Sequence, residues 1–159
     1  MEFDDFKNKI VILDRFLSDQ LRLKYIDMFV NCEHPRYHEQ ICVNHKFKDG
    51  YCYLGYLWDF MKNPIVIDQE YIESKNEINE VYVMWDNHSC ERIWIKDYWK
   101  FDKNVVLKLN FSTLLLGYHF LPEDIYIFDD SFSWTFVLTH EELKGKRYCL
   151  KCGEIDASI

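Results

Sequence analysis

The stretch Asp124-Ile-Tyr-Ile-Phe-Asp-Asp-Ser-Phe-Ser-Trp-Thr-Phe-Val-Leu-Thr-His-Glu141 predicts two strands joined by an acidic turn. Large apolar residues recur at every second position of its second half, at Phe132, Trp134, Phe136 and Leu138. That two-residue period is typical of a half-buried strand, and we expect Trp134 to be buried. The segment from Glu123 to Glu142 also holds six carboxylates and no Lys or Arg. It therefore predicts a rigid aromatic strand edged with acid, which suits a basic partner.

Outward from this stretch, the sequence predicts helices first and strands later. The first thirty residues are mainly helical, with Ser18 as a candidate cap, and Ile10-Val-Ile-Leu13 fits either a helix or a strand. Short helices are expected at 54–61, around Trp58, and at 112–116, with Ser112 as its cap. Strands are expected at 41–47, 81–85, 92–95, 105–109, 124–128, 132–139 and, at an edge, 147–150.

This order favours an α+β fold, with N-terminal helices followed by a mostly antiparallel sheet of about four to six strands. We expect a single domain over residues 1–159 with the Trp58 helix packed on the sheet. The sequence leaves open whether the residues after Gly153 are ordered.

Composition and charge exclude several classes of protein. The chain is 48% apolar and 18% aromatic, which excludes a disordered protein. Its formal net charge of −8 disfavours binding to nucleic acid or to an anionic membrane, and favours basic partners. Alternatively, this net negative charge only keeps the protein soluble and does not attract a partner. No apolar run approaches the roughly 18 residues that span a bilayer. The acidic N-terminus lacks the basic start of a signal peptide, so we expect a cytoplasmic protein with free thiols.

One pair of cysteines has the spacing of a metal half-site. Cys149-Leu-Lys-Cys152 is the only CxxC motif in the chain, and such a pair supplies two of the four ligands of a structural zinc. The other two would have to come from elsewhere: from Cys42 and His45, or from Cys32 with His34 or His38. None of these forms a familiar ligand block, so we expect reduced thiols with no metal and no cofactor.

Acid–base residues offer an alternative based on catalysis. Asp86, His88 and Ser89 lie in one short loop, where neighbours rarely form a catalytic triad. We expect Asp86 and Ser89 to bond the loop backbone and His88 to be exposed. A metal-dependent hydrolase built from His88, Asp129 and His140 remains the alternative, although paired aspartates before a serine more commonly form a solvated hairpin turn.

Three sequence motifs resemble those of a known protein family. The first is Gly55-Tyr-Leu-Trp-Asp-Phe-Met61, and the second is Val83-Met-Trp-Asp-Asn-His-Ser89 with Arg92-Ile-Trp-Ile95. The third runs from Tyr126-Ile-Phe-Asp-Asp-Ser-Phe-Ser-Trp134 through Thr139-His-Glu141. Over residues 50–152 the chain resembles small bacterial immunity proteins of contact-dependent inhibition and related polymorphic toxin systems. The resemblance implies a non-catalytic cytoplasmic protein that binds and neutralises a cognate toxin domain. It fixes neither the toxin nor the contact residues.

Charge suggests where such a toxin would bind. The candidates are Asp129 and Asp130 in the turn, Glu141 and Glu142 after the strand, and Glu73 and Glu77 in the acidic stretch 64–80. Nuclease toxins need basic surfaces to hold nucleic acid, so a basic toxin of this type is the expected partner. A housekeeping interaction module with the same acidic surface is a further alternative.

Overall fold

A seven-stranded antiparallel sheet organises the chain, in a computed structural model that describes residues 1–43, 45–91 and 100–155. Its strands are, in spatial order, β1 (Val11–Ile12), β6 (Leu107–Asn110), β5 (Glu80–Trp85), β7 (Ile125–Phe128), β8 (Trp134–Leu143), β9 (Lys146–Gly153) and β4 (Ile65–Ile67). The strands β2 (His45–Phe47) and β3 (Gly50–Cys52) form a separate hairpin. The α+β fold class is therefore confirmed, with a larger sheet than expected.

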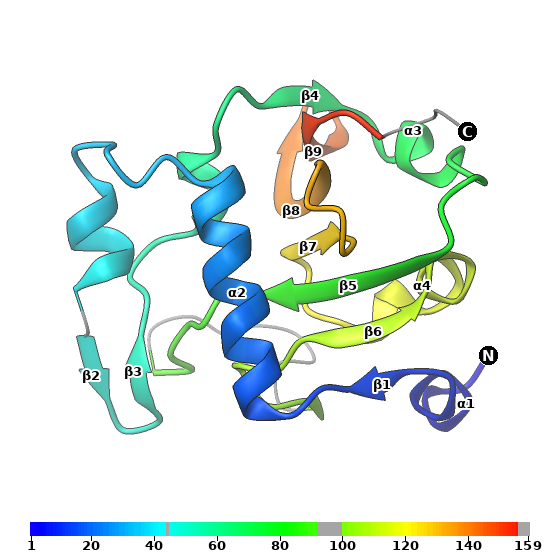
Figure 1. Ribbon diagram of the computed structural model, residues 1–159, viewed down its shortest axis with the longest axis horizontal. Helices are drawn as coiled ribbons and strands as arrows, with labels where there is room; N and C mark the ends of the chain where they lie inside the picture. The colour runs from blue at the N-terminus through cyan, green and yellow to red at the C-terminus, as the bar shows by residue number, and fades with distance from the viewer. Residues whose placement is uncertain (44, 92–99, 156–159) are drawn as a thin grey trace.

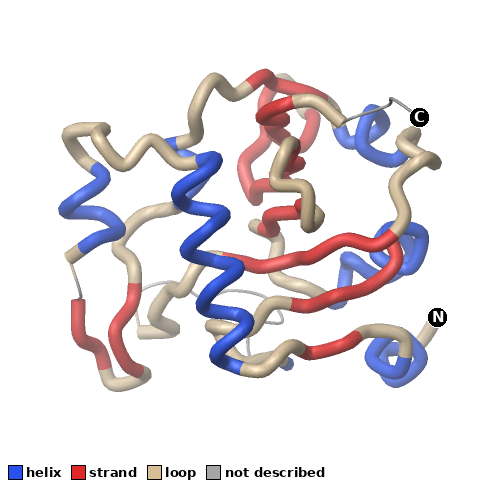
Figure 2. The backbone as a smooth tube through the Cα atoms, in the orientation of Figure 1, coloured by secondary structure: helices blue, strands red, loops and turns tan. Residues whose placement is uncertain are grey.

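The helical segments fall into two groups, one on either side of the strands (Figures 1 and 2). One group holds α2 (Arg15–Phe29), the π-helical turn η1 (His38–Cys42) and the 3-10 turn η2 (Leu57–Phe60). The other holds α1 (Phe3–Asn8), α3 (Gln69–Glu73), α4 (Phe111–Gly117) and the 3-10 turn η4 (Tyr118–Phe120). Among the described residues, no helix is long and apolar enough to cross a membrane.

Each face of the sheet carries its own hydrophobic core. On one face, Trp134 and Phe136 pack with Phe6 of α1 and Leu114 of α4. On the opposite face, alternate residues of the same strands, chiefly Tyr126 and Val137, pack against Tyr25 and Phe29 of α2 and Leu57 of η2. A sheet covered on both faces has strands that are buried throughout, rather than on alternate residues.

The central strand β8 shows the consequence. Trp134 is buried as predicted, with 1% of its surface exposed, but Thr135, Val137 and Thr139 are fully buried as well. The prediction of a half-buried strand is therefore wrong, because α2 covers the face that the sequence left to solvent. Phe132 also departs from the predicted face: it has a positive φ of 52° and packs with the opposite core.

Several predicted elements differ in extent. The strands expected at 81–85 and 124–128 are confirmed as β5 and β7, and the ambiguous run at 10–13 contains the edge strand β1. The expected edge strand at 147–150 lies instead between β8 and β4, and the Trp58 helix is only the turn η2. Ile41 falls in η1 rather than in a strand. The strand expected at 92–95 lies outside the described residues.

The helix caps also differ from expectation. The side chain of Asp14 caps α2 by accepting from the backbone N–H of Leu17 at 2.8 Å. Ser18 lies inside the helix, where its hydroxyl accepts from the backbone N–H of Val106. The α4 helix begins at Phe111, and so Ser112 is not its cap.

Candidate functional site

A β-bulge interrupts β8 just after its buried portion. Leu138 pairs with Cys149 and Glu142 pairs with Arg147, so the three β8 residues 139–141 oppose Tyr148 alone. Bulges bend a strand and redirect its side chains, and they are common beside functional sites. This bulge marks the point where β8 passes from the core, ending at Thr139, to the surface at His140.

Side chains hold the bulge in place by bonding its backbone. The Nε of Arg147 donates to the carbonyl oxygen of Thr139 at 2.9 Å, and the N–H of His140 donates to Oδ1 of Asp124 at 3.0 Å. The N–H of Glu141 donates to Oγ1 of Thr139 at 3.1 Å. These bonds replace the pairing that the bulge disrupts, so the geometry of the redirected residues is well defined.

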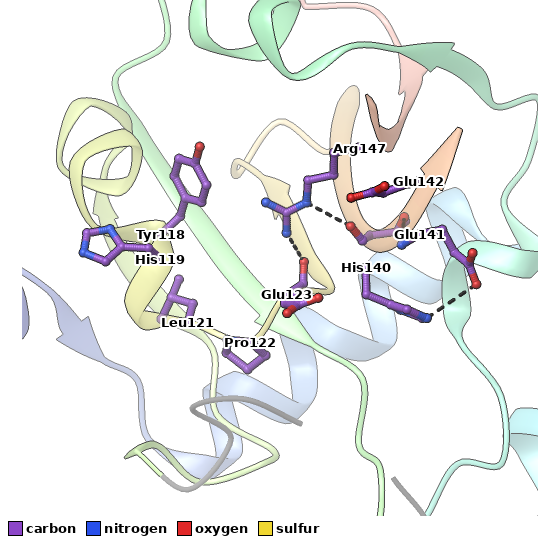
Figure 3. A pocket seen from close by; sticks show the side chains of 10 residues that line it. Tyr118, His119, Leu121, Pro122, Glu123, His140, Glu141, Glu142 and Arg147 are labelled. Atoms are coloured by element: carbon purple, nitrogen blue, oxygen red, sulfur yellow. Dashed lines mark hydrogen bonds and ion pairs between the residues drawn. The ribbon is translucent and has the colours of Figure 1, made fainter. Parts of the chain in front are cut away.

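The redirected residues line a pocket of about 300 Å³, named here the acidic pocket. Its walls are Tyr118, His119, Leu121, Pro122, Glu123, Thr139, His140, Glu141, Glu142 and Arg147. Figure 3 shows Arg147 between Tyr118 and Glu142, above Glu123. Segments from η4, the loop before β7 and the β8–β9 hairpin therefore meet here.

The pocket carries excess negative charge that its own arginine does not neutralise. The guanidinium of Arg147 donates to the backbone carbonyls of Thr139 and Glu123 and lies 6.0 Å from the centre of the Tyr118 ring. In the described part of the chain, the carboxylates of Glu123 and Glu142 form no ion pair. They are left available to an external cation.

Glu73 extends this acidic surface from a distant part of the sequence. The hydroxyl of Tyr118, a pocket residue, donates to Oε1 of Glu73 at 3.2 Å. Gln69 Nε2 donates to the same carboxylate oxygen at 3.3 Å and also contacts the Tyr118 hydroxyl. The fold thus brings Glu73 close to the pocket that Glu141 and Glu142 line.

A stack of aromatic rings, here called the Trp58 stack, borders the pocket. The ring centres of Tyr56 and Trp58 lie 5.2 Å apart with their planes inclined by 30°, and the ring centre of Tyr56 lies 5.2 Å from that of His140. Asp124 holds the stack: it accepts from Trp58 Nε1 at 3.0 Å and from the backbone N–H of His140 at 3.0 Å, and both its oxygens lie 3.0 Å from His140 Nδ1.

Charge around His140 changes how readily the ring binds a proton. Partial burial lowers the pKa of His140, but the carboxylates of Asp124, Glu141 and Glu123 raise it, and the net effect is a pKa above the usual value. The imidazole Nε2 lies 3.4 Å from Oε1 of Glu141. The pocket therefore gains positive charge as the pH falls, which weakens its attraction for cations.

The loop after β5 is buried rather than exposed. Asp86 and His88 are 2% and 1% exposed, so the predicted exposure of His88 is wrong. His88 Nε2 lies 2.7 Å from the carbonyl oxygen of Gly55, and Asp86 accepts from the N–H of Leu57 at 2.9 Å. Both side chains thus fix the segment before and within η2.

The structure divides the predicted acidic residues among three places. Glu141, Glu142 and Glu73 lie at or beside the acidic pocket, whereas Asp129 and Asp130 lie in the β7–β8 turn, at the opposite end of these strands. Asp129 is structural, because it accepts from Ser131 and from Trp134 Nε1 at 3.1 Å, whereas Asp130 is exposed. Glu77 is exposed in the connection between α3 and β5.

The residues of the hydrolase alternative are spread out. The ring of Tyr56 touches both His88, at 4.4 Å, and His140, at 5.2 Å. Asp129 precedes β8, whereas His140 lies toward the other end of this strand, roughly 20 Å from its start at Trp134 when each residue rises about 3.3 Å. No group of three His, Cys, Asp or Glu side chains suited to a metal ion occurs among residues 1–43, 45–91 and 100–155.

The CxxC pair is divided by the sheet. Cys149 packs in the core under α1, α3 and α4, whereas Cys152 packs in the core under α2. Both thiols are buried and free, and burial raises the pKa of each to about 11. Two side chains on opposite faces of a sheet cannot bind one ion, so the spacing alone was misleading.

Sequence reasoning missed most of the residues that build this site, namely Tyr56, Tyr118, Glu123, Asp124 and Arg147. Asp124 and Glu123 were visible only as members of the acidic run, and their positions beside His140 depend on the pairing of β7 with β8.

No protein-family model, no curated protein and no solved structure matches this chain.

Proposed function

We propose that this chain is a non-catalytic immunity protein that acts in the cytoplasm, where it binds and neutralises a basic bacterial toxin domain through the acidic pocket and the adjoining Trp58 stack. The observation that carries the proposal is the set of carboxylates at the pocket. Glu123 and Glu142 lack ion pairs in the described part of the chain, while Arg147 in the pocket wall is bound to backbone carbonyls.

The physical properties of the site favour binding over chemistry. Partly exposed aromatic rings beside carboxylates are common anchors of protein interfaces, and Trp58 and Tyr56 are held in place by packing and by Asp124. A surface of negative potential accelerates encounter with a basic partner. A nuclease-type toxin presents such a basic surface, because it must hold nucleic acid. Neutralisation follows if the inhibitor occupies that surface.

A charge reversal at the pocket tests the proposal. Glu142→Lys should weaken binding to the cognate toxin domain, sought among the products of neighbouring genes, and should reduce protection of cells that produce that toxin. The loss is about 2–5 kcal/mol if the carboxylate is buried in the interface, whereas a contact at the rim mainly slows association. Binding is measured by surface plasmon resonance at two salt concentrations, and protection by survival of toxin-producing cells.

Asp130→Lys is the matched control, since it makes the same charge change on an exposed residue at the opposite end of the β7 and β8 strands. Equal effects of the two variants would show that net charge matters and not the pocket. An effect of Asp130→Lys alone would place the interface at the turn. Wild-type protein that fails to protect cells from any neighbouring toxin, but binds other basic proteins through the same pocket, would favour the housekeeping interaction module.

A further inference from the structure

A chain of hydrogen bonds leads from the buried interior to the Trp58 stack. Asp86, which is 2% exposed, accepts from the hydroxyl of Tyr126 at 2.8 Å. That hydroxyl oxygen accepts in turn from the backbone N–H of Trp58 at 3.0 Å. The indole Nε1 of Trp58 donates to Asp124, which also binds His140. The interior and the candidate interface are thus connected through consecutive hydrogen bonds that join the segment after β5 to β7, η2 and β8.

Asp86 also stabilises the start of η2 directly. The first residue of this turn is Leu57, whose N–H donates to Oδ1 of Asp86 at 2.9 Å. The residue preceding the turn, Tyr56, provides no side-chain cap. A carboxylate from another element therefore supplies the acceptor that an N-cap residue normally provides. Loss of its charge weakens this bond and the bond from Tyr126 together, because both donors face a charged acceptor.

We propose that Asp86 is a positioning residue for the toxin-binding surface: its carboxylate, acting through Tyr126 and the start of η2, holds Trp58 in the stack, and protonation of Asp86 loosens that stack. The proposal rests on the proposed function only for the role of the surface. The positioning of Trp58 is a property of the free protein and can be measured without a toxin.

The surroundings of Asp86 support a change of charge within the physiological range. Burial raises the pKa of Asp86 to about 6, although His88, the N–H of Leu57 and the hydroxyl of Tyr126 oppose the rise. The titratable groups that face it come from every neighbouring segment: Tyr25 of α2, Tyr53 after β3, Tyr56 before η2, His88 after β5, and Asp124 and Tyr126 at β7.

The test follows the indole N–H signal of Trp58 by NMR between pH 4.5 and 8, with the signal assigned from Trp58→Phe. In the wild-type protein, we expect an inflection near pH 6 in addition to the titration of His140, which is followed through its own ring signals. Asp86→Asn should remove the inflection. Asp59→Asn is the matched control, because it removes an exposed carboxylate from the same turn, and it should retain the inflection.

Tyr126→Phe provides a second variant in which Asp86 is intact. It should reduce the inflection of the Trp58 indole signal, because one of the two routes from Asp86 to Trp58 is removed. The Leu57 amide signal should keep its inflection, because Leu57 binds Asp86 directly. An inflection that persists in Asp86→Asn, or that is absent from the wild-type protein, overturns the positioning role. If coupling is observed but Glu142→Lys leaves toxin binding unchanged, the proposed interface fails while the role of Asp86 stands.

Discussion

The hydrogen bond between Tyr25 and Thr135 tests whether α2 covers the sheet. The hydroxyls of these two residues lie 2.8 Å apart in a fully buried site. Thr135 Oγ1 donates to the carbonyl oxygen of Ile127 at 2.8 Å, so the Tyr25 hydroxyl is the donor between the two side chains. The sequence pattern placed Thr135 on a solvent-facing side, whereas the structure places it beneath the helix.

The two single substitutions should differ in cost. Tyr25→Phe removes a donor but leaves Thr135 bonded to Ile127, and should cost about 0.5–1.5 kcal/mol of unfolding free energy. Thr135→Val keeps the shape but leaves the Tyr25 hydroxyl buried without this acceptor, which should cost about 1–3 kcal/mol. The double variant should cost no more than Thr135→Val alone, because it removes the hydroxyl that Thr135→Val leaves without an acceptor. The coupling energy is then about 1 kcal/mol, as expected for residues in direct contact.

Urea denaturation of the four proteins measures these differences. Tyr82→Phe serves as the control, since that hydroxyl is partly exposed and has no hydrogen-bond partner in the described part of the chain. Its unfolding free energy should change by less than about 0.5 kcal/mol. Additive effects of Tyr25→Phe and Thr135→Val, or a negligible cost of Thr135→Val, would refute the burial of this face under α2.

Other expected outcomes concern the core, the pH and the thiols. Trp134→Ala should lower the unfolding free energy by about 3–5 kcal/mol in urea denaturation, because a buried indole leaves a cavity. Asp86 has a pKa of about 6 in the folded protein and 3.8 in the unfolded chain, so the unfolding free energy should fall by about 3 kcal/mol as the pH rises between these values. In Asp86→Asn, this fall should be absent from unfolding free energies measured by urea denaturation from pH 4 to 7. Cys149 and Cys152 should resist alkylation in the folded protein, whereas mass spectrometry should find the exposed thiols labelled: Cys32, Cys42 and Cys90. Stoichiometric zinc in freshly purified protein would contradict free thiols at the CxxC pair.

The central hairpin could be predicted from the sequence because its strands are short, apolar and joined by a recognisable turn. The alternation of Trp134, Phe136 and Leu138 defined one face correctly, and all three pack in the same core. The other face could not be predicted, since Thr135 and Thr139 are polar side chains that become buried only when a partner supplies their hydrogen bonds. A period-two pattern distinguishes the two faces of a strand, but not a face that is solvated from one that is covered by a helix.

The acidic pocket was only partly predictable for a related reason. Glu141 and Glu142 follow the strand directly, and the acidic run made them conspicuous. The contributions of Glu73 and Arg147 arise from long-range pairing: α3 reaches the site through Tyr118, and Arg147 reaches it across the bulge. Spacing along the chain also left a metal half-site at Cys149 and Cys152 as an alternative, whereas the fold places these two thiols in different cores. Asp129 lies in the turn between β7 and β8, as the sequence predicted.

The strand β8 has a buried half and an exposed half, and under the proposed function these halves serve stability and binding respectively. From Trp134 to Thr139 every residue is buried, so this half is fixed by the cores on both faces of the sheet. The bulge then turns His140 and Glu141 toward the pocket, and Asp124 and Arg147 bind its backbone. A side chain on a rigid strand loses little conformational freedom when a partner binds, which improves affinity without further contacts. Substitutions that loosen the bulge, such as Asp124→Asn, should therefore weaken toxin binding more than they reduce stability. A parallel measurement of both quantities decides this, because equal losses would mean that Asp124 acts through the fold alone.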